Sequence, residues 1–171
     1  MTWIMTRSGR HFDLLNPRST EIKIDDIATG LSNICRFTGQ LPCFYSVAQH
    51  CVMASHIVHE RFSLEALLHD AQEAYVGDMS TPLKSMLPGY KEIEDKIESV
   101  IRSMFGLPSK QSPEVKQADL KMLATERRFF GLDDGTKWPI LDGIVPLDVV
   151  IDAMTPEQAK KEFLKRFVEL T

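Results

Sequence analysis

The sequence has few of the features that mark a secreted, membrane-bound or zinc-ribbon protein. Its three cysteines, Cys35, Cys43 and Cys51, form no CxxC pair, so they predict reduced thiols rather than disulfides or a zinc site. No apolar run approaches the roughly 18 residues of a membrane span, and the N-terminal residues do not resemble a signal peptide. These absences predict a cytoplasmic protein with no membrane partner.

An excess of basic charge is missing as well. The 20 Lys and Arg residues are outnumbered by 24 Asp and Glu residues, which gives a formal net charge of −4. A chain with this charge has no electrostatic footprint for a nucleic-acid backbone, so we expect no nucleic-acid polymer as a partner. Hydrophobic residues make up 43% of the 171 positions, which is enough for one packed domain.

Apolar residues recur at helical spacing along most of the chain and predict an all-α fold. Helices are expected after Asp25 as N-cap, over about 46–60, 63–77, 90–105 and 113–130, and after Thr155, which has capping-box spacing to Gln158. Residues 131–154 show no sustained periodicity. They predict a long connection that packs over the helices through Trp138 and Ile140.

Before the first helix, two short runs with β-forming residues lie on either side of Ser8-Gly9 and predict a small N-terminal β-hairpin. The expected organisation is a hairpin extension at residues 1–24 followed by one helical body at residues 25–171. Apolar faces on the 90–105 helix and the C-terminal helix provide a surface on which copies of the chain can associate.

Polar side chains interrupt the apolar faces of two predicted helices. His50 lies inside the apolar arc of the 46–60 helix, and Asp119 and Glu126 lie inside that of the 113–130 helix. A lone inward-facing histidine is more often a hydrogen-bonded structural residue than a ligand, and a buried acid often pairs with an arginine. Either way, each of these groups needs a partner, and a cation is one such partner.

The 63–77 helix adds His69 and Asp70, so the chain offers two imidazoles and two carboxylates when His50 and Asp119 are included. This mixed set suits a divalent cation such as Mn²⁺, Co²⁺, Fe²⁺, Mg²⁺ or Zn²⁺ and leaves coordination positions open, as catalytic sites do. No histidine follows His69, so the sequence predicts a single metal.

The order H…HD…D resembles the signature of the HD-domain metal-dependent phosphohydrolases. The stretches YSVAQH (45–50), LLHDAQEAYVGDMSTPLK (67–84) and KQADLKMLATE (116–126) are similar to bacterial HD-type 5'-deoxynucleotidases and small phage dATP triphosphohydrolases, over about residues 25–130. This resemblance implies a single HD-domain helical bundle, a nucleotide substrate and a homo-oligomer. It also implies that His50, His69, Asp70 and Asp119 are the metal ligands.

The same resemblance implies roles for five further residues. Glu73 and Asp78 match catalytic acids, and Arg36 matches a phosphate-contacting arginine. Lys84 is a weaker phosphate candidate, and Phe37 stands where the deoxynucleotidases tend to carry Trp, so it is a candidate base or sugar contact.

The resemblance therefore implies a 5'-deoxyribonucleotidase that converts a deoxynucleoside monophosphate and water into deoxynucleoside and phosphate. One alternative is a dNTP triphosphohydrolase that releases triphosphate, for which Lys84, Lys91 and Lys96 are available to hold the outer phosphates. Another is a non-catalytic, metal-stabilised module that binds nucleotides and regulates another protein.

Overall fold

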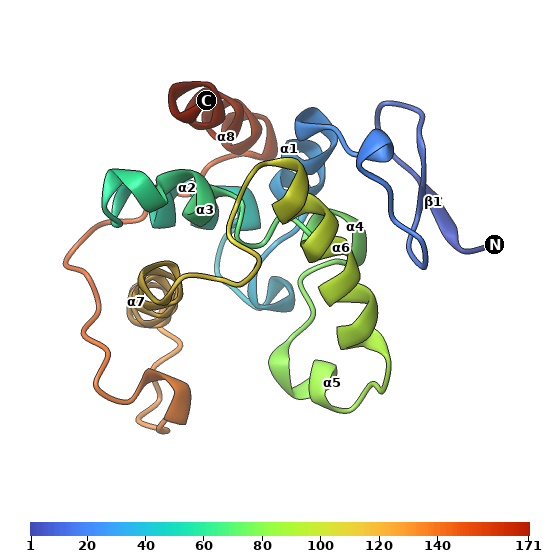
Figure 1. The fold of residues 1–171 in the computed structure, drawn as a ribbon. Helices are drawn as coiled ribbons and strands as arrows, with labels where there is room; N and C mark the ends of the chain where they lie inside the picture. Colours follow the sequence, from blue (N-terminus) through green and yellow to red (C-terminus); the bar gives the residue numbers. More distant parts are fainter.

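The computed structural model describes residues 1–171 and is mostly helical, with one small antiparallel sheet at the N-terminus (Figure 1). The expected all-α class with an N-terminal hairpin is therefore confirmed. The helices are α1 (Ile24–Asn33), α2 (Val47–His56), α3 (Ser63–Leu67), α4 (Glu73–Val76), α5 (Thr81–Ser85), α6 (Tyr90–Met104), α7 (Pro113–Phe129) and α8 (Pro156–Leu170). None of them combines the length and apolar character needed to span a lipid bilayer.

The hairpin consists of β1 (Trp3–Met5) and β2 (His11–Asp13), with Ile4 opposite Phe12. Gly9 has a φ of 78°, which glycine adopts without steric cost and which lets the chain reverse there. Phe12 is fully buried, and its ring stacks on Tyr75 with 3.8 Å between centroids. The hairpin is thus attached to the helices by part of the main core.

That core is formed by side chains of α1, α2, α3, α6 and α8, and α8 lies across α1 and α2 (Figure 1). Gly30 brings α1 very close to α4, because a Cβ placed on Gly30 would lie 2.8 Å from the Cβ of Ala74. The close approach fixes the position of α4, which carries Glu73. Helices α6 and α7 lie on opposite sides of the view in Figure 1.

Several predicted helix boundaries were wrong. The 63–77 helix is broken into α3 and α4 by tight turns over residues 68–72, where i to i−3 hydrogen bonds such as Ala71 N to Leu68 O replace the α-helical pattern. Helix α2 ends at His56 rather than near residue 60. Lys23, not Asp25, is the N-cap of α1, and Asp25 lies in its first turn.

Other boundaries agree with the local signals. Helix α7 begins with Pro113, α6 covers the expected span, and α8 begins with the expected capping box between Thr155 and Gln158. Proline at the first helical position and a reciprocal cap act within a single turn of chain. Such signals can therefore be read without knowledge of the tertiary structure.

Residues 131–154 form the expected long connection between α7 and α8, with a single 3₁₀ turn at Pro139–Leu141. The prediction that Ile140 anchors it was wrong, because that side chain is 53% exposed. Ile151 is buried against Tyr45 and Phe130 instead. Trp138 is half-buried and packs on the guanidinium of Arg127, 4.7 Å from its ring centroid.

Candidate metal centre

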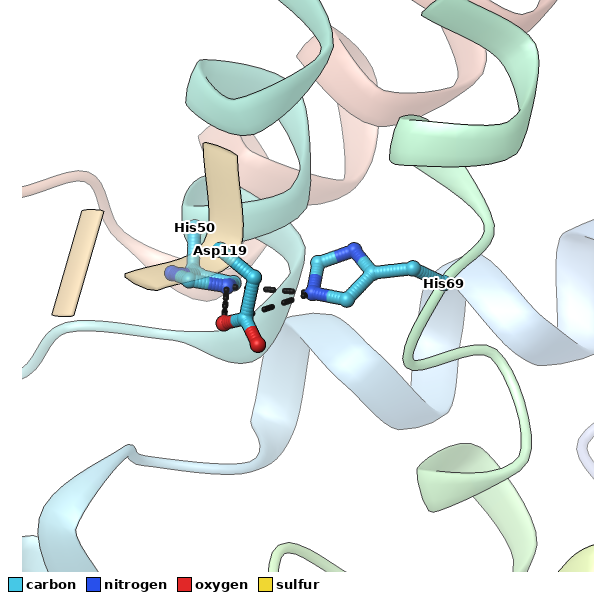
Figure 2. A group of neighbouring side chains, drawn as sticks. All are labelled: His50, His69 and Asp119. Atoms are coloured by element: carbon cyan, nitrogen blue, oxygen red, sulfur yellow. Dashed lines mark hydrogen bonds and ion pairs between the residues drawn. The ribbon is translucent and has the colours of Figure 1, made fainter. Parts of the chain in front are cut away.

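Three side chains from separate elements converge on one another (Figure 2). His50 extends from α2, His69 from the turn after α3, and Asp119 from α7. The Nε2 atoms of the two histidines are 3.3 Å apart. Asp119 Oδ1 lies 3.4 Å from His50 Nε2 and 3.8 Å from His69 Nε2.

Asp70 completes this group. Its Oδ2 lies 3.2 Å from His69 Nε2 and 3.8 Å from His50 Nε2. Both histidine side chains are almost fully buried, whereas those of Asp70 and Asp119 are 18% and 22% exposed. The structure therefore brings together all four residues that the sequence suggested as ligands, with the carboxylates towards solvent. We refer to His50, His69, Asp70 and Asp119 as the metal group.

The hydrogen bonds of the two histidines test whether this group suits a cation. His69 Nδ1 is 2.7 Å from Ala66 O, and His50 Nδ1 is 2.6 Å from Glu126 Oε1. A carbonyl or carboxylate oxygen only accepts, so each Nδ1 carries hydrogen and donates it. In the neutral rings, both Nε2 lone pairs then face one another and two carboxylates. Donor atoms of His50, His69 and Asp119 all lie within 4.8 Å of one another, so these three residues could hold a metal ion, and Asp70 lies beside them.

The titration behaviour of the group follows from the same geometry. Burial lowers the pKa of His69, but the charges of Asp70 and Cys51 and the interactions with Asp119 together outweigh burial, so the pKa lies well above the usual value. Burial raises the pKa of Asp119, yet its interactions with His50 and His69 hold this pKa far below the usual range. Negative charge is thus favoured on this carboxylate, and positive charge is favoured beside it.

Glu126 lies behind His50 and is completely buried. Its Oε1 accepts hydrogen bonds from His50 Nδ1 and from the Tyr45 hydroxyl at 2.9 Å, and its Oε2 accepts from Arg36 Nη2 at 2.9 Å. The sequence indicated that Glu126 pairs with an arginine or a cation, and the structure identifies Arg36 as that arginine. Its links to His50 and Tyr45 were missed, because they join segments far apart in the sequence.

Arg36 is buried, and its guanidinium faces two ways. Nε and Nη2 donate to Glu126, while Nη1 lies 3.9 Å from Asp70 Oδ2. Only Nη1 is therefore directed at the metal group, so Arg36 is positioned to meet a negatively charged ligand there. Burial opposes the charged form, but the nearby carboxylates of Glu126 and Asp70 raise the pKa of Arg36 well above its usual value.

Two further acids lie beside the group. Glu73 is 7% exposed, and its Oε2 has no hydrogen-bond partner in the protein. Burial, together with the charges of Asp70 and Asp78, raises the pKa of Glu73 well above its ordinary value. Burial also raises the pKa of Asp78, although Arg36 opposes the effect. A cation bound by the neighbouring ligands would offset both shifts.

The other two candidate substrate contacts are placed differently. Phe37 is half-buried outside the apolar core, and its ring lies 5.5 Å from the Arg36 guanidinium. Its φ of 55° is unusual for a residue with a side chain, and Thr38 shares this conformation. Lys84 Nζ forms an ion pair with Glu94 at 2.7 Å, so its charge is already matched within the protein.

Sequence reasoning missed two more neighbours of the metal group. Cys51 is buried, and with His69 and Asp70 it forms a second set of three donor groups within 4.8 Å of one another. Burial raises the pKa of the Cys51 thiol to about 11. Lys116 Nζ lies 2.9 Å from Asp119 Oδ2, one helical turn earlier on α7. Spacing of three residues between unlike charges was the available signal for this pair.

A cavity of about 420 Å³ lies elsewhere, between the residues after α2 and the first turns of α7. It is lined by Ile57, Val58, His59, Pro113, Glu114, Gln117, Ala118 and Lys121. None of the candidate ligands lines this cavity, so its volume is no reason to place the functional site there.

Comparison with known proteins gives two relatives. The chain is 51% identical over 172 aligned residues to "Uncharacterized protein YfdR" of Escherichia coli (strain K12), covering 100% of this chain and 97% of that protein. It is 39% identical over 126 residues to "Uncharacterized protein RCAP_rcc00048" of Rhodobacter capsulatus, covering 68% of this chain and 64% of that protein. No protein-family model matches the chain.

Proposed function

The chain belongs to the family of the Escherichia coli protein YfdR, and we propose that it is a metal-dependent phosphohydrolase of the HD-domain type that acts on small nucleotides. The observation that carries the proposal is the pair of facing Nε2 atoms, which are 3.3 Å apart and bordered by two carboxylates. In this proposal one divalent cation is held by His50, His69, Asp70 and Asp119.

When bound, such a cation supplies a Lewis acid for a phosphoryl oxygen and lowers the pKa of water. Arg36 contributes positive charge from the buried side, because its Nη1 faces Asp70 while Glu126 holds the other two nitrogens. A guanidinium held in this way binds a phosphate oxygen with little loss of side-chain entropy. It also stabilises the charge that develops there during hydrolysis.

Glu73 and Asp78 are proposed to manage protons. Glu73 Oε2 lacks a partner in the protein, so it is free to accept a hydrogen bond from water at the reacting phosphorus and to take up its proton. Asp78 is partly buried within reach of the charges of Arg36 and Asp70, where it can bind a sugar hydroxyl or share the proton with Glu73. Phe37 is exposed enough to contact a base or sugar.

We favour a deoxynucleoside monophosphate, and hence a 5'-deoxyribonucleotidase, over a dNTP. A triphosphate substrate needs additional free cations for its outer phosphates. Of the three lysines suggested for that role, Lys84 is paired with Glu94 at 2.7 Å and Lys91 with Asp95 at 2.8 Å, which leaves only the exposed Lys96. Arg36 then remains as the buried cation facing the metal group, which suits a single phosphate. The triphosphohydrolase remains the second candidate because the same metal group would serve it.

The test measures the release of phosphate, pyrophosphate and triphosphate from NMPs, dNMPs, NTPs and dNTPs. The protein is first treated with chelator and then given Mn²⁺, Co²⁺, Mg²⁺ or Zn²⁺. Phosphate released from dNMPs, dependent on metal and abolished in Asp119→Ala, is the expected result. Triphosphate released from dNTPs would replace the nucleotidase with the triphosphohydrolase.

A regulatory module that binds nucleotide without hydrolysing it gives a different outcome. In that case no metal produces turnover, and Glu73→Ala alters neither metal nor nucleotide binding. In the enzyme, Glu73→Ala retains metal and nucleotide binding but loses turnover, because only the proton acceptor is removed. Equal turnover in Glu73→Ala and the natural protein would contradict the proposed role of Glu73.

A further inference from the structure

We infer that Glu126 is a positioning residue that fixes His50 in its Nδ1–H form and holds Arg36 at the same time. One buried carboxylate would thereby keep the His50 Nε2 lone pair free for the cation and orient the Arg36 guanidinium towards a phosphate. The inference rests on the metal centre of the proposed function, but it does not depend on which nucleotide is hydrolysed.

The position of Glu126 on α7 explains how one helix contacts both sides of the His50 ring. Asp119 and Glu126 are seven residues apart, which is almost two full turns, so both project from the same face. Asp119 reaches the two Nε2 atoms, and Glu126 reaches the far side of the His50 ring. His50 is therefore held between two acids of the same helix.

Both oxygens of Glu126 are fully used by donors. Oε1 accepts from His50 and Tyr45, and Oε2 accepts from Nε and Nη2 of Arg36. The ionised Glu126 carboxylate has no hydrogen to donate, so it needs no acceptor among these partners. Because a carboxylate accepts only, the His50 ring has to donate from Nδ1, which leaves the Nε2 lone pair directed at His69 and Asp119.

A glutamine in this position has one oxygen and one NH₂ group. The NH₂ group cannot face the Arg36 nitrogens without a clash between donors, so the glutamine oxygen takes that side. The NH₂ group then faces the Tyr45 hydroxyl and His50 Nδ1, both of which are able to accept. His50 would shift its hydrogen to Nε2, and the lone pair required by a cation would be lost.

The experiment compares Glu126→Gln with Glu65→Gln in the full chain. Glu65 is a matched control because it is also buried and ion-paired, to Arg102 at 2.6 Å, without contacting the metal group. Isothermal titration with Mn²⁺ measures metal affinity, and ¹⁵N NMR of the metal-free protein, at a pH where the ring is neutral, identifies the hydrogen-bearing nitrogen of His50.

We expect Glu126→Gln to bind Mn²⁺ about 10 to 100 times more weakly and to carry hydrogen on Nε2 of His50. Glu65→Gln should retain the natural affinity and the Nδ1–H form. Unchanged Mn²⁺ affinity in a folded Glu126→Gln overturns the inference alone, whereas a natural protein that binds no divalent cation overturns the proposed function as well.

If Glu126→Gln does not fold, the NMR measurement on the natural protein decides. Hydrogen on Nδ1 of His50 supports the inference, and hydrogen on Nε2 overturns it. A variant that merely loosened the core would weaken folding without moving this hydrogen, so the measurement separates a positioning role from a structural one.

Discussion

Replacing Gly30 by alanine tests the close contact between α1 and α4. In an open helix this change stabilises a protein by about 1 kcal/mol, because glycine is the poorer helix former. Here the added Cβ would lie 2.8 Å from the Cβ of Ala74 and 2.9 Å from its Cα and carbonyl oxygen. Two of these three atoms belong to the backbone, so rotating a side chain cannot relieve the overlap.

The helices must therefore separate, and overpacking of this kind costs about 1 to 3 kcal/mol. At roughly 2 to 4 °C per kcal/mol for a chain of this size, Tm should fall by about 2 to 12 °C. Helix α4 carries Glu73, so its displacement should also reduce the proposed turnover, by as much as about 100-fold for a shift near 1 Å. Mn²⁺ affinity should change little, because the four proposed ligands lie outside α1 and α4.

Calorimetry and Mn²⁺ titration of Gly30→Ala measure these effects, and Asn33→Ala on the exposed end of α1 serves as the control. The control should stay within about 0.5 kcal/mol of the natural protein. A Gly30→Ala variant more stable than the natural protein would refute the reasoning, since it would mean that helix propensity outweighs the contact.

Three other outcomes are expected. Adding Mn²⁺ to chelated protein at about 100 times its Kd should stabilise the fold by about 2.7 kcal/mol and raise Tm by roughly 5 to 11 °C, and an equal rise in Asp119→Ala would contradict the ligand set. Burial raises the pKa of Glu65, but hydrogen bonds from Ser112 and Arg102 bring it below the ordinary 4.5, so its stabilisation is complete above that pH and lost as pH falls through the lower folded value. Glu65→Gln should therefore cost about 1.5 to 3 kcal/mol of unfolding free energy at neutral pH, and this difference from the natural protein should close in acid. A difference that widens below pH 4.5 would reverse the sign we assign. Phe12→Ala should cost about 3 to 5 kcal/mol in urea unfolding, and a loss below about 1 kcal/mol would mean that the hairpin unfolds separately from the helices.

Much of the helical architecture was predictable because its signals are local. Pro113 at a first helical position and the Thr155–Gln158 box act within one turn, and the structure has helices beginning at both. His50 and Asp119 were predictable because polar side chains on apolar faces require partners. His69 and Asp70 were added to them by the order H…HD…D in the sequence.

Local signals failed in two ways. Apolar spacing predicted a continuous 63–77 helix, but the chain forms tight turns over residues 68–72, where His69 Nδ1 bonds the Ala66 carbonyl. Elsewhere the outcome depends on contacts between segments that are separated in the sequence. Ile140 and Ile151 are equally apolar in sequence, yet only Ile151 reaches the pocket beside Tyr45. The sequence indicated no partner for Lys84, but in the structure it forms an ion pair with Glu94 of α6.

The sequence by itself determined which residues form helices and which polar side chains must find partners inside. Only the tertiary structure decided which partners they find. Arg36 is 90 positions from Glu126, and His50 is 76 positions from it, so no periodicity connects them. Their geometry depends on how α2 and α7 pack, because a hydrogen bond within about 3 Å requires both backbones to be fixed by the core around them.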